Sequence, residues 1–573
     1  MNKPKFFPET ALYIVAFLIA FGIRLVSLGG SFLTNPEATW ALQALHLAQG
    51  THPDIGAQPG LVLFTGSLFF VFGSSEFLAR LAPALVGSLL VFSPLLFSDR
   101  LGKTAAGALA FALALDPGLV AMSRQVDGHI LALSFTLLGM GFLIRKNAAG
   151  AGIFSGLAFL GGASFWLGGL IILLTGLVYL GTKRGRRSNA SLSGVETEPE
   201  PAVYPGFIKL VLLWFAGTVF FAGTLFFLEP KGLSAIAASL AAFIQGLSGA
   251  GGVSFTQVLG GLLFYEVLPL VLAVIASIRA ILNKNRTDEL LALAWLTALA
   301  VVVLYPGRQV GDLVWVAVPM WALGVRFLVQ VFSSLMPVKL VIGESILTIV
   351  ILVCAWLNFI AAMALQFADA TPHWLSIVFM FFFLGIAVIL LTWGWGLKVA
   401  LQGVGLGVCF LMVIFTLSAA WRATGQESRP EQELWITGSD FREADLLLKT
   451  ANDYSLWNTN NPIGLDLTVE NGSPSLQWLF RNFTQVSFVD ELQADAAPSM
   501  VVTPEQTSLS LSGLYTGQNF VTEQSPSWST LSASDWINWM IFRQAPLTKT
   551  TVVLWVRSDL FPGSSDFRQN KTP

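Results

Sequence analysis

Acidic side chains next to predicted membrane surfaces are the residues of this chain best suited to chemistry. Glu37 lies in the sequence N-P-E-A-T-W, where Asn35 suits a helix cap and Pro36 suits the first helical turn. A carboxylate in this position can deprotonate an acceptor hydroxyl, or it can only complement the positive end of the helix dipole. We take Glu37 as a candidate catalytic base, and the residues alone leave both interpretations open.

A second acid occurs in the sequence S-R-Q-V-D-G-H, where Arg124 and Asp127 stand three residues apart. A local ion pair on one helical face is the simpler interpretation of this spacing. An acid and an arginine near a membrane boundary are nevertheless costly unless they are paired or used. Asp127 is therefore a candidate catalytic residue, and Arg124 is a candidate substrate-binding residue.

Arg308 lies in Y-P-G-R-Q-V-G-D and is one of the few basic residues in a predicted outer segment. Its planar guanidinium can bind a phosphate through two hydrogen bonds, or it can pair with Asp312 four residues later. Three residues of the first predicted loop complete the candidate substrate-binding set: His52, Asp54 and Gln58. A histidine next to a proline, as at His52, is more typical of a turn than of a metal ligand.

Several classes of site and partner are not expected. The histidines lack the spacing of a metal site, and no phosphate-binding or dinucleotide-binding motif occurs, so we expect no metal and no cofactor. The net charge of −2 gives no electrostatic basis for binding nucleic acid. Cys354 and Cys409 both lie in apolar segments, which makes a disulfide framework unexpected.

The elements that must position the candidate residues are membrane helices. Of the 573 residues, 54% are hydrophobic and only 12% are charged, whereas a soluble domain has about twice that charged fraction. Repeated apolar runs of about 20 residues predict an α-helical polytopic membrane protein with about 13 transmembrane helices. The first of them, from Ala11, is expected to be an uncleaved helix.

Positive charges predict the orientation of these helices. Most basic residues of the predicted transmembrane domain, 1–421, fall in segments that share one side of the membrane if the short apolar run 60–73 lies flat in the interface: Lys3, Lys5, Arg100, Lys103, Arg145, Lys146, Lys183, Arg184, Arg186, Arg187, Lys284, Arg286, Lys339 and Lys398. Because positive charge marks the inner side, the N-terminus is predicted to be cytoplasmic. An odd number of crossings then puts the C-terminal part outside.

The chain is predicted to divide near residue 421. Residues 1–421 form the transmembrane domain, with a first outer loop at 30–76 and a Pro-, Glu- and Ser-rich cytoplasmic linker at 181–205. Residues 422–573 are more polar and predict an extracytoplasmic soluble α/β domain, with strands at 499–503 and 551–557 and helices near 440–449 and 535–543. No internal repeat is evident, which disfavours a secondary transporter built of inverted halves.

A set of short motifs runs through the first third of the chain in a fixed order. They are Glu37-Ala38 through Gly50, Pro59-Gly60-Leu61, Phe72-Gly73, Arg80-Leu81-Ala82-Pro83, and Ser123, Arg124 and Asp127. Their order resembles the GT-C superfamily of integral membrane glycosyltransferases, in the branch of protein O-mannosyltransferases and aminoarabinose transferases. Four segments of the C-terminal part are similar to prokaryotic members related to an archaeal flippase-associated family: 473–483, 497–502, 536–543 and 552–557.

The resemblance implies an inverting transferase that moves a sugar from a polyprenyl-phosphate donor to an extracytoplasmic glycan, lipid or protein acceptor at the membrane, with Glu37 as general base. The Asp-Glu motif of that superfamily reads Pro36-Glu37 here. Either Glu37 serves alone, or Asp54 or Asp127 replaces the missing acid, or transfer activity is lost. The alternative function is a non-catalytic lipid-linked-sugar binding or flippase-associated protein.

Overall fold

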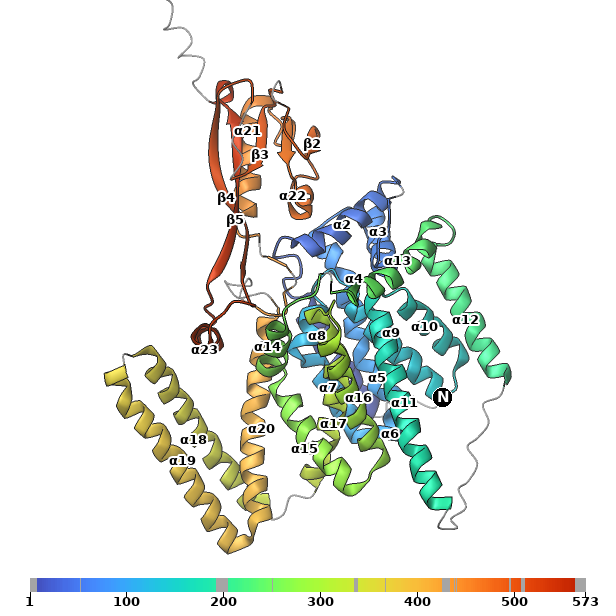
Figure 1. Ribbon diagram of the computed structural model, residues 1–573, viewed down its shortest axis with the longest axis vertical. Helices are drawn as coiled ribbons and strands as arrows, with labels where there is room; N and C mark the ends of the chain where they lie inside the picture. Colours follow the sequence, from blue (N-terminus) through green and yellow to red (C-terminus); the bar gives the residue numbers. More distant parts are fainter. Residues whose placement is uncertain are drawn as a thin grey trace, which may run out of the picture.

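The computed structural model describes residues 8–51, 53–191, 205–249, 251–333, 338–365, 367–424, 433–436, 438–439, 441–493, 496–505 and 511–561. A long helical bundle and a smaller sheet domain follow one another along the longest axis of the molecule (Figure 1). Three parts of the predictions fall outside the described residues: the candidate His52, the basic residues Lys3 and Lys5, and residues 192–204 of the linker predicted at 181–205.

The first half of the bundle contains long apolar helices and several short ones near its ends. These helices are α1 (Pro8–Leu25), α2 (Asn35–Ala48), α3 (Pro59–Phe72), α4 (Glu76–Leu89), η1 (Leu90–Phe92), α5 (Ser93–Leu96), α6 (Ser98–Leu101), α7 (Lys103–Leu115), α8 (Pro117–Met122), α9 (His129–Ile144), α10 (Ala148–Phe159) and α11 (Ala163–Ser191).

The second half of the bundle ends in three long helices, of which α18 and α19 stand to one side and join the rest through α20 (Figure 1). Its helices are α12 (Pro205–Gly223), α13 (Lys231–Gly246), α14 (Phe255–Tyr265), α15 (Val267–Asn283), α16 (Arg286–Leu304), η2 (Val310–Leu313), α17 (Val314–Ser333), α18 (Val338–Ala364), α19 (Phe367–Trp395) and α20 (Leu397–Arg422).

Within the described part of the chain, eight helices are long and apolar enough to cross a membrane. A ninth span results if α14 and α15, which bend by 86° where they meet, count as one. Five further apolar helices are shorter, at 10–17 residues. The predicted class, a multi-pass helical membrane protein, is confirmed, whereas the predicted number of about 13 spans is not.

The predicted first outer loop folds into α2 and α3, which pack against each other beneath the sheet domain (Figure 1). Helix α2 begins as the N-P-E sequence predicts, but its cap is Thr34 instead of Asn35. The two helices approach closely at Gly66, where an added Cβ would lie 2.7 Å from the side chain of Leu47. Glycine at this position therefore allows the contact between α2 and α3.

The C-terminal part forms a five-stranded mixed sheet of order β2-β1-β3-β5-β4, with parallel pairing among the first three strands and antiparallel pairing of β5 with β3 and β4. Its elements are α21 (Ala444–Thr459), β1 (Leu467–Glu470), α22 (Pro474–Leu479), β2 (Val486–Val489), β3 (Met500–Pro504), β4 (Tyr515–Pro526), α23 (Ala533–Phe542), β5 (Leu547–Arg557) and η4 (Ser558–Leu560). The predicted strands correspond to β3 and β5. A hydrophobic core separate from that of the bundle includes Leu447, Val469 and Leu554.

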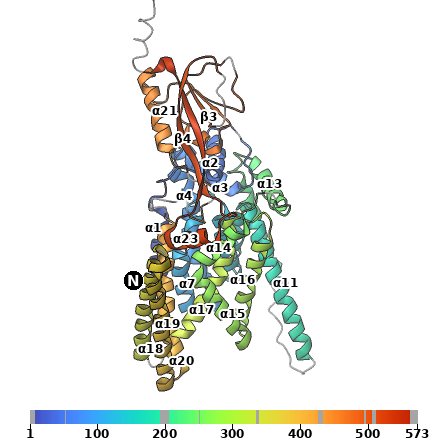
Figure 2. The same ribbon diagram turned by 60° about the vertical axis from the view of Figure 1, so that its left-hand side comes forward.

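Strands β4 and β5 are much longer than the other three strands, so they continue as a two-stranded ribbon beyond the sheet. The ribbon runs toward the bundle and carries α23 at its end, close to α14 (Figures 1 and 2). Phe264 of α14 packs against Trp536 and Trp539 of α23, with ring centroids 5.9 and 5.4 Å apart. The C-terminal part therefore reaches the bundle at two places, above α2 and at α14.

Candidate active site

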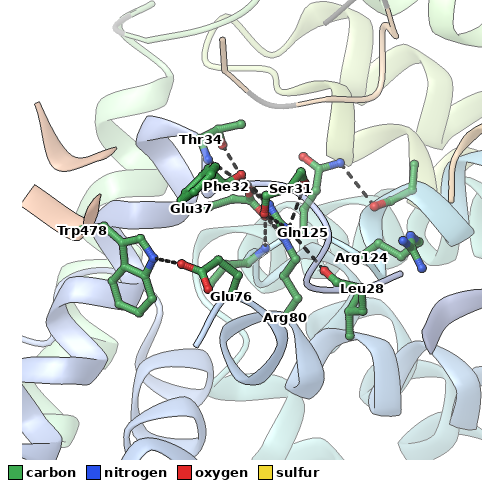
Figure 3. Close-up of polar contacts among 12 residues, drawn as sticks. Leu28, Ser31, Phe32, Thr34, Glu37, Glu76, Arg80, Arg124, Gln125 and Trp478 are labelled. Atoms are coloured by element: carbon green, nitrogen blue, oxygen red, sulfur yellow. Dashed lines mark hydrogen bonds and ion pairs between the residues drawn. The ribbon is translucent and has the colours of Figure 1, made fainter. Parts of the chain in front are cut away.

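Polar contacts fix the C-terminal domain on the first loop of the bundle. The Asn35 side chain donates to Glu523 of β4, and its oxygen accepts the backbone N–H of Ser475 at 3.0 Å. On the other side, the indole N–H of Trp478 donates to Glu76 at 2.8 Å (Figure 3). These contacts tie β4 and α22 to the N-terminal ends of α2 and α4.

A cavity of about 740 Å³ lies at this junction. Its walls come from the first loop, from the loops and helix ends of the bundle, and from the C-terminal domain. Its lining includes these polar, aromatic and proline side chains: Pro36, Trp40, Gln58, Asp127, His129, Ser164, Phe243, Gln245, Gln257, Tyr305, Gln309, Asp312, Ser439, Ser525 and Trp528. Segments that are far apart in the sequence therefore line one cavity.

Asp127 stands in the link between α8 and α9 and lines this cavity. Its Oδ1 accepts the backbone N–H of Gly128 at 2.6 Å and the side-chain amide of Gln58 at 3.1 Å. Its Oδ2 lies 2.8 Å from Nδ1 of His129. The side chain remains 13% exposed, and the residue lines the cavity.

His129 bridges Asp127 and a second acid, Asp312. The Nε2 atom of His129 lies 3.2 Å from Oδ1 of Asp312, whose other oxygen accepts the backbone N–H of Gln309 at 2.8 Å. Contact with a carboxylate at each ring nitrogen favours the doubly protonated, positively charged imidazole, although the contact at Nδ1 does not have the geometry of a hydrogen bond. The ring fits only because residue 311 is glycine, where an added Cβ would lie 2.8 Å from Cγ of His129.

The surroundings of Asp127 keep it ionised. Burial alone would raise the pKa of Asp127, but the charge of His129 and the hydrogen bonds from Gln58 and Gly128 outweigh it and lower that pKa. The carboxylate is therefore an available proton acceptor at neutral pH. The two nitrogens of His129 point to one acid each, and no group of His, Cys, Asp and Glu side chains among the described residues is arranged to hold a metal ion.

Glu37 is 2% exposed and does not line the cavity. Its carboxylate forms a two-pronged ion pair with Arg80, with Nε at 2.8 Å and Nη2 at 2.7 Å (Figure 3). It also accepts the N–H and the hydroxyl of Thr34 and the N–H of Val126. These five hydrogen bonds occupy both oxygens and leave no open face for a substrate hydroxyl.

Arg80 completes the polar contacts around the start of α2. Besides Glu37, it donates to the backbone oxygens of Leu28, Ser31 and Phe32 at 3.2, 2.9 and 3.1 Å. The connection from α1 to α2 is thus held by one guanidinium group, as Figure 3 shows.

Arg124 does not pair with Asp127. Its guanidinium donates to the backbone oxygens of Arg24 and Val26 at 2.8 and 2.7 Å, at the end of α1, and to that of Thr424 at 2.5 Å, just after α20. Cations are favourable at helix C-termini, where carbonyl groups lack partners. Arg124 therefore joins the ends of two helices, and the local ion pair considered from its spacing is not formed.

The remaining candidates differ in their distance from the cavity. Arg308 is half-buried between two lining residues, and its Nη1 lies 3.3 Å from the backbone oxygen of Val303. Its Nε has no hydrogen-bond partner and it forms no ion pair with Asp312 or with any other described acid. Asp54 is exposed and accepts the N–H of Gly56 at 3.3 Å in a turn, while Gln58 contacts Asp127 directly.

Sequence reasoning did not assign a role to His129 or identify Asp312 as its partner. His129 follows Asp127 by two residues, which was a usable signal, because polar residues at a helix start often act together. Asp312 lies 183 residues further on, and only the packing of η2 beside α8 and α9 brings it to the same ring.

No protein-family model matches the chain. No curated protein matches it either. Among solved structures, ArnT from Cupriavidus metallidurans bound to undecaprenyl phosphate is 17% identical; the match covers 94% of this chain and 98% of that one, with a TM-score of 0.52. The archaeal oligosaccharyltransferase AglB from Archaeoglobus fulgidus, in complex with an inhibitory peptide and a dolichol-phosphate, is 14% identical over 88% of this chain and 70% of its own, with a TM-score of 0.44.

ArnT is an aminoarabinose transferase with the GT-C fold. The similarity to it extends over nearly the whole of both chains, including the C-terminal part. The fold implied by the short motifs of the first third of the sequence, that of the GT-C membrane glycosyltransferases, is therefore confirmed.

Proposed function

We propose that this protein is a membrane glycosyltransferase that moves a sugar from a polyprenyl-phosphate donor to an extracytoplasmic acceptor. Its fold is shared with ArnT, which was solved with undecaprenyl phosphate bound. The observation that carries the proposal is the oriented, ionised Asp127 in a cavity of about 740 Å³ at the junction of bundle and C-terminal domain.

Asp127 is the residue we assign as general base. The acceptor hydroxyl oxygen attacks the anomeric carbon of the donor while its proton passes to the Asp127 carboxylate. The bond from that carbon to the phosphate oxygen breaks, and polyprenyl phosphate leaves with the electron pair. Attack opposite the leaving group gives inversion at the sugar carbon.

His129 and Asp312 hold Asp127 in its reactive orientation. Because the imidazole contacts an acid on each side, the Asp127 carboxylate cannot rotate without losing the contact at 2.8 Å. A base fixed in this way avoids the cost of reorganisation during reaction.

Arg308 is our candidate for binding the donor phosphate. Its neighbours Gly307 and Gln309 line the cavity, and its Nε is unpartnered, so the guanidinium can turn toward an anion without breaking an ion pair. The leaving group develops negative charge, which a nearby cation stabilises.

Glu37 supports the site instead of reacting, in our proposal. Its five hydrogen bonds already saturate both oxygens. Pro36, which stands where the GT-C motif has Asp, lines the cavity, and so does Asp127. We infer that Asp127 replaces the acid missing from position 36.

The cavity faces the extracytoplasmic side in this proposal, and the N-terminus lies in the cytoplasm. Helix α6 and the link between α15 and α16 lie at the end of the bundle away from the sheet domain (Figure 1). These segments contain Arg100 and Lys284, and Arg286 follows at the first residue of α16. Positive charge at that end supports a cytoplasmic location for it.

The test is release of polyprenyl phosphate by the purified protein in lipid, with a panel of polyprenyl-phosphate sugars. Asp127→Asn should abolish most of the release, whereas Asp445→Asn, which removes an exposed acid from α21, should leave it unchanged. Full activity of Asp127→Asn would refute the assigned base. Saturable donor binding without release by the wild-type chain would instead support the non-catalytic, lipid-linked-sugar binding function.

A further inference from the structure

The chemical character of the cavity lining points to the class of acceptor. Four aromatic rings face it: Trp40, Phe243, Tyr305 and Trp528. Amide and hydroxyl side chains supply most of the polar groups: Gln58, Gln245, Gln257, Gln309, Ser164, Ser439 and Ser525. The charged lining residues are Asp127, His129 and Asp312, and none of the described lysines or arginines lines the cavity.

One wall comes entirely from the C-terminal domain. Its lining residues are Ile436, Gly438, Ser439, Ser525, Pro526 and Trp528. The hydroxyls of Ser439 and Ser525 lie 3.3 Å apart, and Glu523, two residues earlier on β4, bonds to Asn35 of α2. This wall is therefore held at a fixed position relative to the first loop.

Trp528 is the aromatic residue of that wall, and its position is rigid. Its backbone oxygen accepts the hydroxyl of Thr256 at 3.1 Å, which ties it to α14. Its ring packs on Trp536 and edge-to-face on Trp539, with centroids 5.7 and 5.5 Å apart. Trp539 is fully buried, whereas Trp528 is only half-buried and keeps part of its surface toward the cavity.

We propose that the acceptor is an uncharged saccharide and that Trp528 is the surface on which one of its sugar rings stacks; this rests on the function proposed above. A sugar ring offers an apolar C–H face to an aromatic ring and hydroxyls around its edge. Glutamine and serine side chains both donate and accept hydrogen bonds, which matches those hydroxyls. Polar groups placed among aromatic and apolar walls orient a bound ligand.

The same lining disfavours charged acceptors. A phosphorylated or carboxylated acceptor would lie near the carboxylates of Asp127 and Asp312, and like charges repel. The positive charge of His129 already faces these two acids, and Arg308 is assigned to the donor phosphate. Cationic peptides would compete with His129 for the two acids, which its two nitrogens already contact. Specificity for a neutral glycan thus follows from both the attractive and the repulsive groups.

Binding is tested apart from transfer, by saturation-transfer NMR of the full-length protein in lipid nanodiscs. The probes are a neutral hexose oligosaccharide, a uronic-acid oligosaccharide and a lysine-containing peptide. We expect saturable binding of the neutral oligosaccharide alone. Trp528→Ala should weaken it about tenfold, and Trp528→Phe should retain most of it because the ring remains.

The matched control is Trp457→Ala, which removes a 60% exposed tryptophan of α21 in the same domain and should not change binding. Equal or tighter binding of either charged probe, or neutral-glycan binding that Trp528→Ala leaves unchanged, would overturn the proposal. Donor turnover is measured in parallel. If the protein releases polyprenyl phosphate but Trp528→Ala leaves glycan binding unchanged, only the inference about Trp528 is refuted. If glycan binding depends on Trp528 but no polyprenyl phosphate is released, only the transferase function is refuted.

Discussion

The Glu37 carboxylate accepts the backbone N–H of Val126 at 3.1 Å, one residue before Asp127. Two acids that compete for the role of base in the sequence are thus parts of one arrangement. Glu37 and Arg80 fix the start of α2, and the same carboxylate holds the loop that presents Asp127 to the cavity.

Replacing Glu37 should lower stability first and activity second. In Glu37→Gln, the buried Arg80 loses its counter-charge, and breaking a buried pair costs about 3–5 kcal/mol. We expect a clear fall in the thermal unfolding midpoint in detergent, with Glu491→Gln, an exposed acid of the C-terminal domain, as the unaffected control. An unchanged midpoint would show that the pair does not stabilise the fold.

Replacing Asp127 should lower activity first and stability second. Asp127→Asn keeps the shape of the side chain but removes the proton acceptor, so the transfer rate should fall by about 10²–10⁴ while donor affinity stays the same. Rates come from polyprenyl phosphate release at saturating donor. A loss explained entirely by weaker donor binding would assign Asp127 to binding instead of proton transfer.

The lowered pKa of Asp127 has a consequence for pH dependence. A carboxylate whose pKa is below that of the unfolded chain, about 3.9, contributes its full stabilisation above that value and loses it only as pH falls through the lowered one. The difference in unfolding free energy between wild type and Asp127→Asn should therefore not shrink as pH falls from 7 to 5, because Asp127 stays ionised in both the folded and the unfolded chain. A difference that already shrinks in this window would contradict the lowered pKa.

Gly311 tests the position of His129. The Cβ of Gly311→Ala would lie 2.8 Å from Cγ of the imidazole, so the ring must shift and pull on Asp127. A misplacement of this size costs about 10²-fold in rate. Gly107→Ala on α7, where nothing lies within 4 Å of the added methyl group, should leave the rate unchanged; equal rates in both variants would remove His129 from the mechanism.

Arg308 should govern donor affinity. In Arg308→Gln, the loss of a charge-assisted contact to phosphate should raise the donor KM by about tenfold or more, with little change in thermal stability because no described ion pair is broken. Arg308→Lys should restore part of the affinity through its charge. Donor KM values that do not differ between Arg308→Gln and wild type would exclude this role.

Features that depend on a local sequence pattern, such as membrane helices and the start of a helix, could be predicted from the sequence. Apolar runs identified the membrane helices, and the N-P-E sequence located the start of α2, although Thr34 took the capping position and freed Asn35 to bind Glu523 of β4. Short apolar helices such as α7 and α10 explain why the number of about 13 spans is not confirmed, because run length alone does not decide whether such helices cross the membrane.

Contacts across long stretches of sequence were not predictable. Asp127 was selected, but its spacing favoured Arg124 as its partner. In the structure the Asp127 carboxylate contacts the imidazole of His129, and that imidazole also contacts Asp312. Arg124 instead binds carbonyls at the ends of α1 and α20. Charge and spacing state what a residue can do, and tertiary packing decides which of these options is used.

A domain with its own hydrophobic core supplies one wall of a cavity whose proposed base, Asp127, belongs to the membrane bundle. In this arrangement the residues proposed for proton transfer and the residues proposed for acceptor binding lie in different domains. Exchanging the residues beyond 433 between related chains would replace the cavity wall of the C-terminal domain and leave Asp127 and its partners unchanged. Diversification in such an architecture proceeds by swapping a module, with no need to redesign helices that must also satisfy the lipid bilayer.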